Sequence, residues 1–207
     1  MIEKLKKMIC FRKNINTPDS KIADLYNKLE EDVIQIKVGS DIVPFGEKIC
    51  SLICDIREEF TYELGFIIPS VHILDNSVLQ ENEYVISIKG IEKFRGFVIP
   101  NEKGIMDEIY ENLKNVVLNN INLILTNEIT EKYIEKVRLT NTLMIWDITG
   151  AISTTEIRII LTDLLEKGKS IKNISEIFEK ISEQIYVENK TNSRSPHKIA
   201  AEICKQI

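Results

Sequence analysis

The sequence predicts an α+β protein, in which a small mixed unit of β-α-β-β-β order is followed by an all-helical region. Between residues 32 and 100, alternation of apolar and polar residues surrounds one amphipathic helical segment. From Asn101 onward the apolar residues recur with a period of about 3.6 residues, and no strand pattern returns. With 207 residues the chain is long enough to bury a core of its own.

The first half of the small unit consists of a strand and a helix. Residues 32–45 begin with alternation and predict a strand, after which residues 39–40 mark a turn or bulge. Residues 46–64 predict a helix whose core stripe is Ile49, Leu52, Ile53, Ile56, Phe60 and Leu64. Gly65 stands where a left-handed residue ends a helix, and Pro69 prevents a nearby restart.

The second half of the unit consists of short strands. Residues 71–74 predict one strand, and residues 75–77 supply the turn that follows it. Residues 83–88 alternate strictly, with Tyr84, Ile86 and Ile88 on one face. The chain then turns at residues 89–90 into a strand at 94–98.

The helical region begins with three helices near residues 103–125, 127–138 and 140–151. Trp146, the only tryptophan, lies within the third of these helices, where we expect it to anchor packing rather than to form a binding box. The spacing of Ser153 and Glu156 predicts a capping box at the start of the next helix.

The remaining helices are marked by their ends. Gly168 ends the helix that follows the capping box, and Ser170 is expected to cap the next one. That helix has the stripe Ile171, Ile174, Ile177, Phe178, Ile181 and Ile185. Residues 188–195 predict a polar linker, and Ser195-Pro196 opens the last helix.

Four regions follow from these patterns. We divide the chain into an N-terminal arm and helix at 1–31, a small α/β subdomain at 32–100, a helical subdomain at 101–187, and a linker with the C-terminal helix at 188–207. Residues 1–13 are rich in Lys and form a basic amphipathic pattern. This segment is open to two interpretations, either an arm that docks on a membrane surface or a partner, or a solvated tail.

Composition excludes several classes of protein. With 43% hydrophobic residues and a formal net charge of −5, the chain is unlike a disordered protein or a general nucleic-acid binder. No apolar run approaches the roughly 18–20 residues that span a bilayer, and the N-terminus lacks the apolar stretch of a secretory signal. The four cysteines are interpreted as reduced, small hydrophobic residues of a cytoplasmic protein.

Residues suited to catalysis are few. No phosphate-binding loop, dinucleotide-binding turn or nucleophile-elbow motif is present. His72 lies near Asp75, and we expect a strand histidine bonded to the backbone rather than an acid–base pair. Cys50 and Cys54 lack the further ligands that a metal site needs, and His197 is expected to be solvated. The sequence therefore predicts no enzyme, metal or cofactor.

Residues 63–98 carry a motif at fixed spacing. It reads E-L-G followed by three apolar residues and Pro, then V-x-I-x-D-N, then N-x-Y-x-I-x-I-x-G and finally R-G. This motif resembles the cytoplasmic domain of the FHIPEP (FlhA-type) family, the export-gate proteins of flagellar and type III secretion systems. The matching positions are Glu63, Leu64, Gly65, Phe66, Ile67, Ile68, Pro69, Val71, Ile73, Asp75, Asn76, Asn82, Tyr84, Ile86, Ile88, Gly90, Ile91, Arg95 and Gly96.

A second stretch, residues 153–174, is similar to a helical segment of the same family. The matching positions there are Glu156, Ile157, Ile160, Leu164, Leu165, Gly168, Ser170 and Ile171. Most of the matching positions in both stretches suit capping, turns and the core. The resemblance therefore supports the fold more strongly than an activity, and no family binding residues are carried over.

The resemblance implies a non-catalytic protein-interaction module that acts in protein secretion. The implied partners are export-apparatus components, or export substrates and their chaperones. Family members carry transmembrane helices ahead of this domain, a second subdomain after the R-G strand and a ring-forming end. We expect a shortened cytoplasmic relative that lacks these parts and does not form the ring. Residues 1–13 could hold it at the inner face of the membrane.

Two other hypotheses stay open. A repurposed adaptor or regulator would keep the fold without any connection to export, because fold does not fix function. A small enzyme would use His72 or Cys50, and a structure with no cleft around either residue would rule it out.

Overall fold

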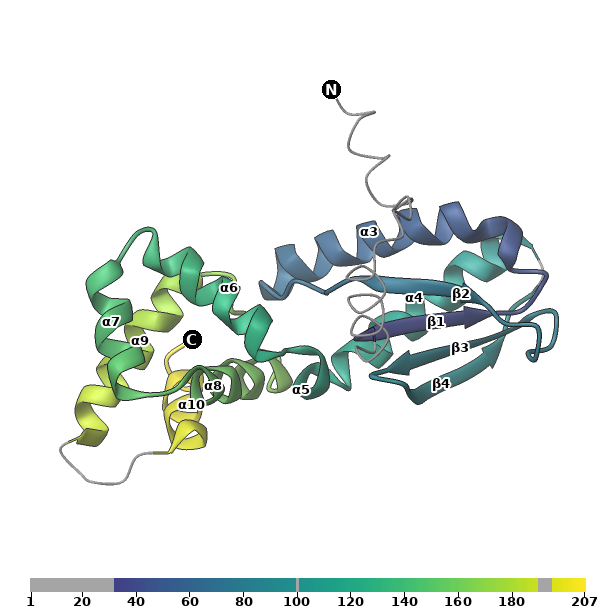
Figure 1. The fold of residues 1–207 in the computed structure, drawn as a ribbon. Helices are drawn as coiled ribbons and strands as arrows, with labels where there is room; N and C mark the ends of the chain where they lie inside the picture. Colours follow the sequence, from purple (N-terminus) through teal and green to yellow (C-terminus); the bar gives the residue numbers. More distant parts are fainter. Residues whose placement is uncertain (1–31, 100, 190–194) are drawn as a thin grey trace, which may run out of the picture. The chain divides into compact units, whose positions relative to one another are not determined.

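The computed structural model describes residues 32–99, 101–189 and 195–207, which belong to one compact unit spanning residues 32–207 (Figure 1). The predicted basic arm and the helix at 14–31 lie outside the described residues. Within the described ranges, no helix combines the length and the apolar character needed to cross a membrane. The strands and helices confirm the predicted α+β class.

A four-stranded mixed sheet forms the small unit. The strands are β1 (Ile34–Val38), β2 (Val71–Asp75), β3 (Glu83–Ile88) and β4 (Ile91–Phe97), in the spatial order β2-β1-β3-β4. β1 and β2 are parallel because helix α3 (Gly46–Leu64) carries the chain back between them, whereas the other pairs are antiparallel. β4 begins earlier than predicted, because the turn at Lys89–Gly90 pairs Ile88 directly with Ile91.

Helix α3 has the predicted bounds and follows a short 3₁₀ turn, η1 (Val43–Phe45). Its buried stripe contains Ile49, Ile53, Ile56 and Phe60. Gly65 ends the helix with φ of 71°, the left-handed conformation that the sequence predicted.

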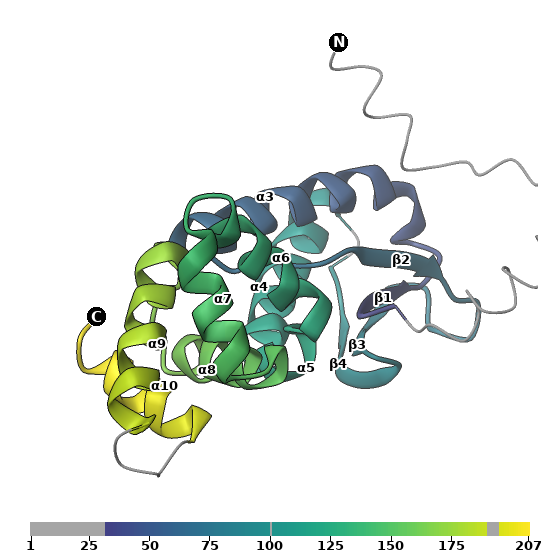
Figure 2. The ribbon, with the colours of Figure 1, turned by 60° about the vertical axis from the view of Figure 1, so that its left-hand side comes forward.

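One face of the sheet packs against α3 and α4 (Glu102–Leu118), as Figure 2 shows. This face carries Ile34, Ile36 and Val38 from β1, opposite Ile88, Ile86 and Tyr84 from β3, and all six side chains are buried. The Tyr84 hydroxyl donates to the Glu108 carbonyl of α4 at 3.3 Å. The sheet and the first helices therefore share a core.

The single helix expected at 103–125 is wrong, because α4 ends at Leu118 and α5 (Ile121–Ile124) follows as a separate turn. Asn120 leaves the helical conformation, with φ of −133°, and its side-chain amide donates to the Val116 carbonyl at 2.8 Å. A short polar side chain thus bonds the carbonyl that a continuing helix would have used.

The remaining helices are α6 (Asn127–Arg138), α7 (Thr142–Ala151), α8 (Thr154–Glu166), α9 (Ile174–Asn189) and α10 (Pro196–Cys204). They gather away from the strands, with α8 packed against α5, α6 and α10 (Figures 1 and 2). The predicted capping box is confirmed: the Glu156 amide donates to the Ser153 hydroxyl, and the Glu156 carboxylate accepts from the Ser153 amide.

The predicted cap at Ser170 is wrong. Helix α9 begins four residues later, and its first backbone bond runs from the Ile177 amide to the Asn173 carbonyl. The Ser170 hydroxyl instead accepts from the Lys172 amide at 3.2 Å, in a short turn ahead of the helix. The Ile171 amide donates to the Leu64 carbonyl at the end of α3, at 2.8 Å, rather than to a carbonyl of its own turn. A long-range contact therefore delays the start of the helix.

Candidate functional site

The structure separates the side chains considered for catalysis. The Nδ1 atom of His72 lies 2.9 Å from the Asp32 carboxylate. The sequence had suggested a bond to the backbone, with a pair to Asp75 as the less favoured alternative, so the partner differs from both. Cys50 and Cys54 are exposed on α3, so these two small hydrophobic side chains contribute little to the core. His197 is exposed as predicted, and its Nδ1 atom lies 2.7 Å from the Asp163 carboxylate.

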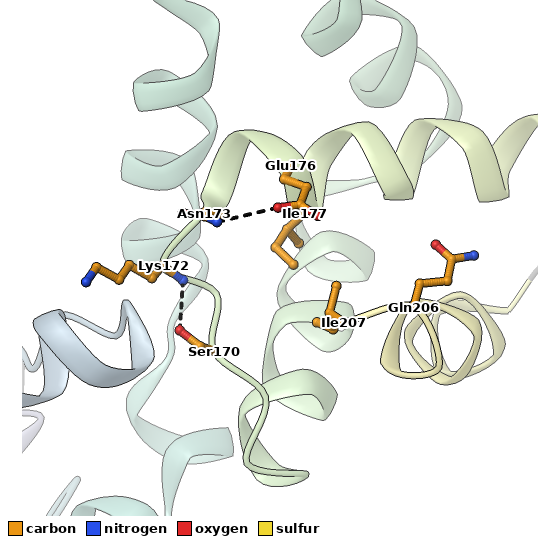
Figure 3. A pocket seen from close by; sticks show the side chains of 7 residues that line it. All are labelled: Ser170, Lys172, Asn173, Glu176, Ile177, Gln206 and Ile207. Carbon is orange, nitrogen blue, oxygen red and sulfur yellow. Dashed lines mark hydrogen bonds between the residues drawn. The ribbon is translucent and has the colours of Figure 1, made fainter.

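No group of three or more His, Cys, Asp or Glu side chains in the described ranges is arranged to hold a metal ion. A pocket of about 360 Å³ lies beside the start of α9, lined by Ser170, Lys172, Asn173, Glu176, Ile177, Gln206 and Ile207 (Figure 3). Its polar groups are engaged with one another, because Ser170 accepts from the Lys172 amide and the Asn173 amide group donates to the Glu176 carboxylate at 3.5 Å. The Lys172 ammonium lies 3.7 Å from the centre of the Tyr62 ring on α3.

The signature residue Gly65 lies at a joint between the sheet unit and the later helices. The Tyr133 hydroxyl of α6 donates to the Gly65 carbonyl at 2.9 Å and accepts from the Ile67 amide at 3.0 Å. A Cβ atom on Gly65 would lie only 2.4 Å from the backbone nitrogen of Lys172. Glycine is therefore required here both by its positive φ and by the close approach of a second chain segment.

Tyr133 is a residue of this joint that the motif did not reveal. Its side chain is buried, and burial raises the pKa of its phenol. Its place in the buried stripe of α6 was visible in the sequence, but its bonds to residues 65–67 were not. The only available signal was a tyrosine in a stripe of aliphatic residues, since a buried hydroxyl needs a partner.

Arg57 of α3 and two signature residues, Asp75 and Asn76, lie at the ends of β2. Arg57 donates to the carbonyls of Ile68 and Pro69, at 2.9 and 3.1 Å. Asp75 is the last residue of β2, opposite Val38. The Asn76 side chain then accepts from the Val78 amide at 2.9 Å, which closes the turn after the strand.

The signature residues of β3 and β4 fix the hairpin. Gly90 has φ of 72° in the turn, and the Asn82 side chain donates to the Val98 carbonyl at 3.2 Å. Gly96 lies opposite Tyr84, and a Cβ atom there would approach the Phe94 ring to 2.7 Å. These positions need small or hydrogen-bonding residues for geometric reasons.

Arg95 forms ion pairs on the face of the sheet away from α3. Its guanidinium contacts the carboxylates of Glu83 and Glu92, the latter at 2.8 Å. The pKa of Glu83 is lowered by the hydrogen bond from the Gln80 amide and by Arg95, and the pKa of Glu92 is lowered by Arg95. Both carboxylates are therefore held in their charged form.

The downstream signature residues also serve the backbone. Glu156 completes the capping box of α8, Gly168 ends the turn after that helix with φ of 70°, and Ser170 forms the short turn before α9. The contacts described for the signature residues in both stretches thus hold strands, turns and helix ends together.

The predicted anchoring role of Trp146 is wrong, because 63% of this residue is exposed. Ile145 and Ile148 occupy the buried side of α7. Successive residues of an α-helix are rotated by about 100°, so Trp146 points away from the side that Ile145 faces. Leu143, one turn earlier on the same outward face, is 71% exposed. The signal was present in the sequence, because α7 carries apolar residues on more than one side and only one side could face this core.

The chain resembles known proteins in both sequence and fold. Residues 6–111 match the family model described as the FHIPEP family. The flagellar biosynthesis protein FlhA of Buchnera aphidicola subsp. Schizaphis graminum is 32% identical over 99 residues, which are 41% of this chain and 14% of that protein. FlhA of Bacillus subtilis is 38% identical over 73 residues, 33% of this chain and 11% of that protein. The matches therefore span about a seventh or less of those relatives.

Solved structures share the fold across most of the chain. The Shigella flexneri MxiA protein has a TM-score of 0.66 at 16% identity, covering 86% of this chain and 67% of that one. CdsV of Chlamydia pneumoniae, in complex with CdsO, has a TM-score of 0.70 at 15% identity, covering 83% and 64%. The EscV cytosolic domain, a nonamer from a type III secretion system, has a TM-score of 0.65 at 15% identity, covering 83% and 63%.

Proposed function

Because the chain belongs to the FHIPEP family, we propose that it acts as a protein-interaction module in protein secretion of the flagellar or type III kind. The observation that carries this proposal is the family match over residues 6–111, which includes the whole sheet unit described here. The fold shared with MxiA, with CdsV and with the EscV cytosolic domain of a type III secretion system, in each case over more than four fifths of this chain, supports it.

The proposed partners are other proteins, either components of an export apparatus or export substrates with their chaperones. Support comes from the neighbour CdsV, whose structure was solved as a complex with the protein CdsO. EscV assembles as a nonamer, and we expect this chain to form no such ring. Sedimentation velocity of the full chain measures the number of copies in the assembly, and a mass near nine copies would contradict the prediction.

We further propose that the chain acts without catalysis, in the cytoplasm, with residues 1–13 able to meet the inner face of the membrane. The contacts of the signature residues support the absence of catalysis, because these residues bond backbone groups, form turns and hold the joint at Gly65. Deletion of residues 1–13 tests the last point, since an unchanged distribution between membrane and soluble fractions would rule out the contact. We also propose residues 32–100 and 101–187 as the two structural subdomains that the joint at Gly65 connects.

Purification of the tagged full chain from cross-linked producing cells tests the proposed function. The expected result is enrichment of identified secretion or flagellar components over a tag-only control. A Gly65→Val variant, which disrupts the joint, is the matched control for binding that depends on the folded chain. A producing organism without any such secretion system, or capture of regulatory proteins alone, would favour the adaptor hypothesis instead.

A further inference from the structure

The two edges of the sheet differ in how open they are to another strand. β4 carries Lys93, Arg95 and an irregularity in its register opposite Ile86 and Ser87. Lysine, other charges and bulges are features with which proteins protect edge strands from pairing. β2 forms the opposite edge, contains no Lys, Arg or Pro, and pairs with β1 in a continuous register. β2 is therefore the less protected edge.

The backbone of β2 presents a regular row of hydrogen-bonding groups on its outer side. The Asn76 amide donates inward to the Val38 carbonyl at 3.0 Å. Because alternate residues of a paired strand bond the same neighbour, Leu74 and His72 also face β1, whereas Val71, Ile73 and Asp75 direct their backbone groups outward. In the part of the chain that the structure describes, no strand pairs with this side.

Acidic groups outnumber basic ones in the chain around β2. Arg57 lies beside the start of the strand, where it donates to the Ile68 and Pro69 carbonyls, but residues 58–88 contain no Lys or Arg, and Asp75 ends the strand. Asp32 lies beside the start of the strand, in contact with His72. Lys37 of β1, the register neighbour of Leu74, is balanced in part by Glu92 of β4, whose pKa its charge helps to lower. An added strand with basic residues would therefore meet favourable charge at this edge.

A second copy of the chain fits this edge less well. Antiparallel pairing of two β2 strands about Ile73 would bring together two protomers that each carry a formal net charge of −5. Each would also bring its own Asp32 and Asp75 to the contact, without a Lys or Arg on β2 to offset them. Like charges across a strand pair are unfavourable.

We propose that the outer edge of β2 binds an extended, basic segment of a partner protein by strand addition. This inference rests on the proposed function and names the kind of partner segment that the module would take. The unpaired backbone groups of Ile73 and its neighbours require a partner that is itself an extended polypeptide. Leu74, 41% exposed on the open face, would pack against one of its apolar side chains.

Calorimetric titration of the full chain with synthetic seven-residue peptides tests the proposal. The probe is Lys-Thr-Val-Thr-Val-Thr-Lys, and the controls replace both Lys by Glu or the central Thr by Pro. We expect the probe to bind and each control to bind at least about tenfold more weakly. Hydrogen exchange should slow at the Val71 and Ile73 amides when the probe is bound.

Two matched variants locate the site. Leu74→Lys places a cation on the β2 edge and should weaken probe binding at least about tenfold. Phe97→Lys makes the same kind of change on β4, at a residue that is 53% exposed, and should leave binding unchanged.

Several results would overturn the proposal. These are equal binding by the Leu74→Lys variant, protection of β4 amides in place of β2 amides, and a dimer that Leu74→Lys dissociates. Stronger probe binding after deletion of residues 1–13 would show that the chain's own arm occupies the edge. If no peptide binds while identified export components still co-purify, the strand-addition proposal is wrong and the proposed function stands.

Discussion

Substitution of Gly65 by Ala should destabilise the protein far more than the same change at Gly168. Both glycines have nearly the same backbone conformation, with φ of 71° and 70°. An added Cβ atom at Gly65 would lie 2.4 Å from the Lys172 nitrogen and 2.5 Å from its Cα atom, whereas at Gly168 nothing lies within 4 Å. The pair therefore separates the cost of the left-handed conformation from the cost of the close approach.

The expected magnitudes follow from these two terms. A left-handed L-residue costs about 1 kcal/mol, so Gly168→Ala should lower the free energy of unfolding by about that amount. Gly65→Ala adds a clash with backbone atoms, which cannot rotate away, and overpacking costs a further ~1–3 kcal/mol. We expect a total near 3 kcal/mol. For a chain of this size, the melting temperature should fall by about 2–4 °C per kcal/mol.

Thermal and urea unfolding followed by circular dichroism provide the measurement. Gly150→Ala is the control with the opposite sign, because Gly150 lies within α7 and its Cβ position faces open space. This change should stabilise the protein by ~0.5–1 kcal/mol. Equal losses for Gly65→Ala and Gly168→Ala would refute the reasoning, since they would mean that the contact with Lys172 does not constrain the joint.

Three further predictions concern single side chains. Tyr133→Phe removes the bonds to Gly65 and Ile67 and should cost about 2 kcal/mol in urea unfolding, and a change below ~0.5 kcal/mol would show that water replaces the hydroxyl. Burial raises the pKa of Tyr84 to about 12, so its neutral form stabilises the folded state below pH ~10, and this contribution should be lost as pH rises toward 12. Tyr84→Phe should make the fall in stability between these pH values smaller by up to ~2 kcal/mol in denaturant titrations at each pH, and identical pH profiles would contradict this. Ser153→Ala should cost ~1 kcal/mol of thermal stability through loss of the helix cap, whereas Ser153→Thr should retain most of it.

Local sequence was sufficient wherever a few neighbouring residues determine the backbone. The helix at Gly46–Leu64 has a continuous apolar stripe. It ends at Gly65, and glycine readily adopts the left-handed conformation that ends a helix. The capping box at Ser153 depends on residues three apart, so its pattern is visible directly. The turn at Lys89–Gly90 was likewise marked by its glycine, although the strand after it began sooner than alternation suggested.

The candidate site was harder to predict than the fold, because its contacts join distant residues. The motif identified Gly65 by its spacing, but its partners Tyr133 and Lys172 follow 68 and 107 positions later. His72 was assigned to the wrong partner for the same reason, since register places Gln35 beside it and brings Asp32 within reach.

The sequence alone determined the α+β class, most helix and strand positions and the family resemblance, because periodicity, caps and motif spacing act over a few residues. Only the tertiary structure decided which side of a mostly apolar helix is covered, which residue starts a helix and in which spatial order the strands lie. Trp146 is exposed because Ile145 and Ile148 already fill the core side of α7. Helix α9 starts late because the Ile171 amide bonds Leu64. Such choices depend on competition among distant partners, which local sequence patterns do not record.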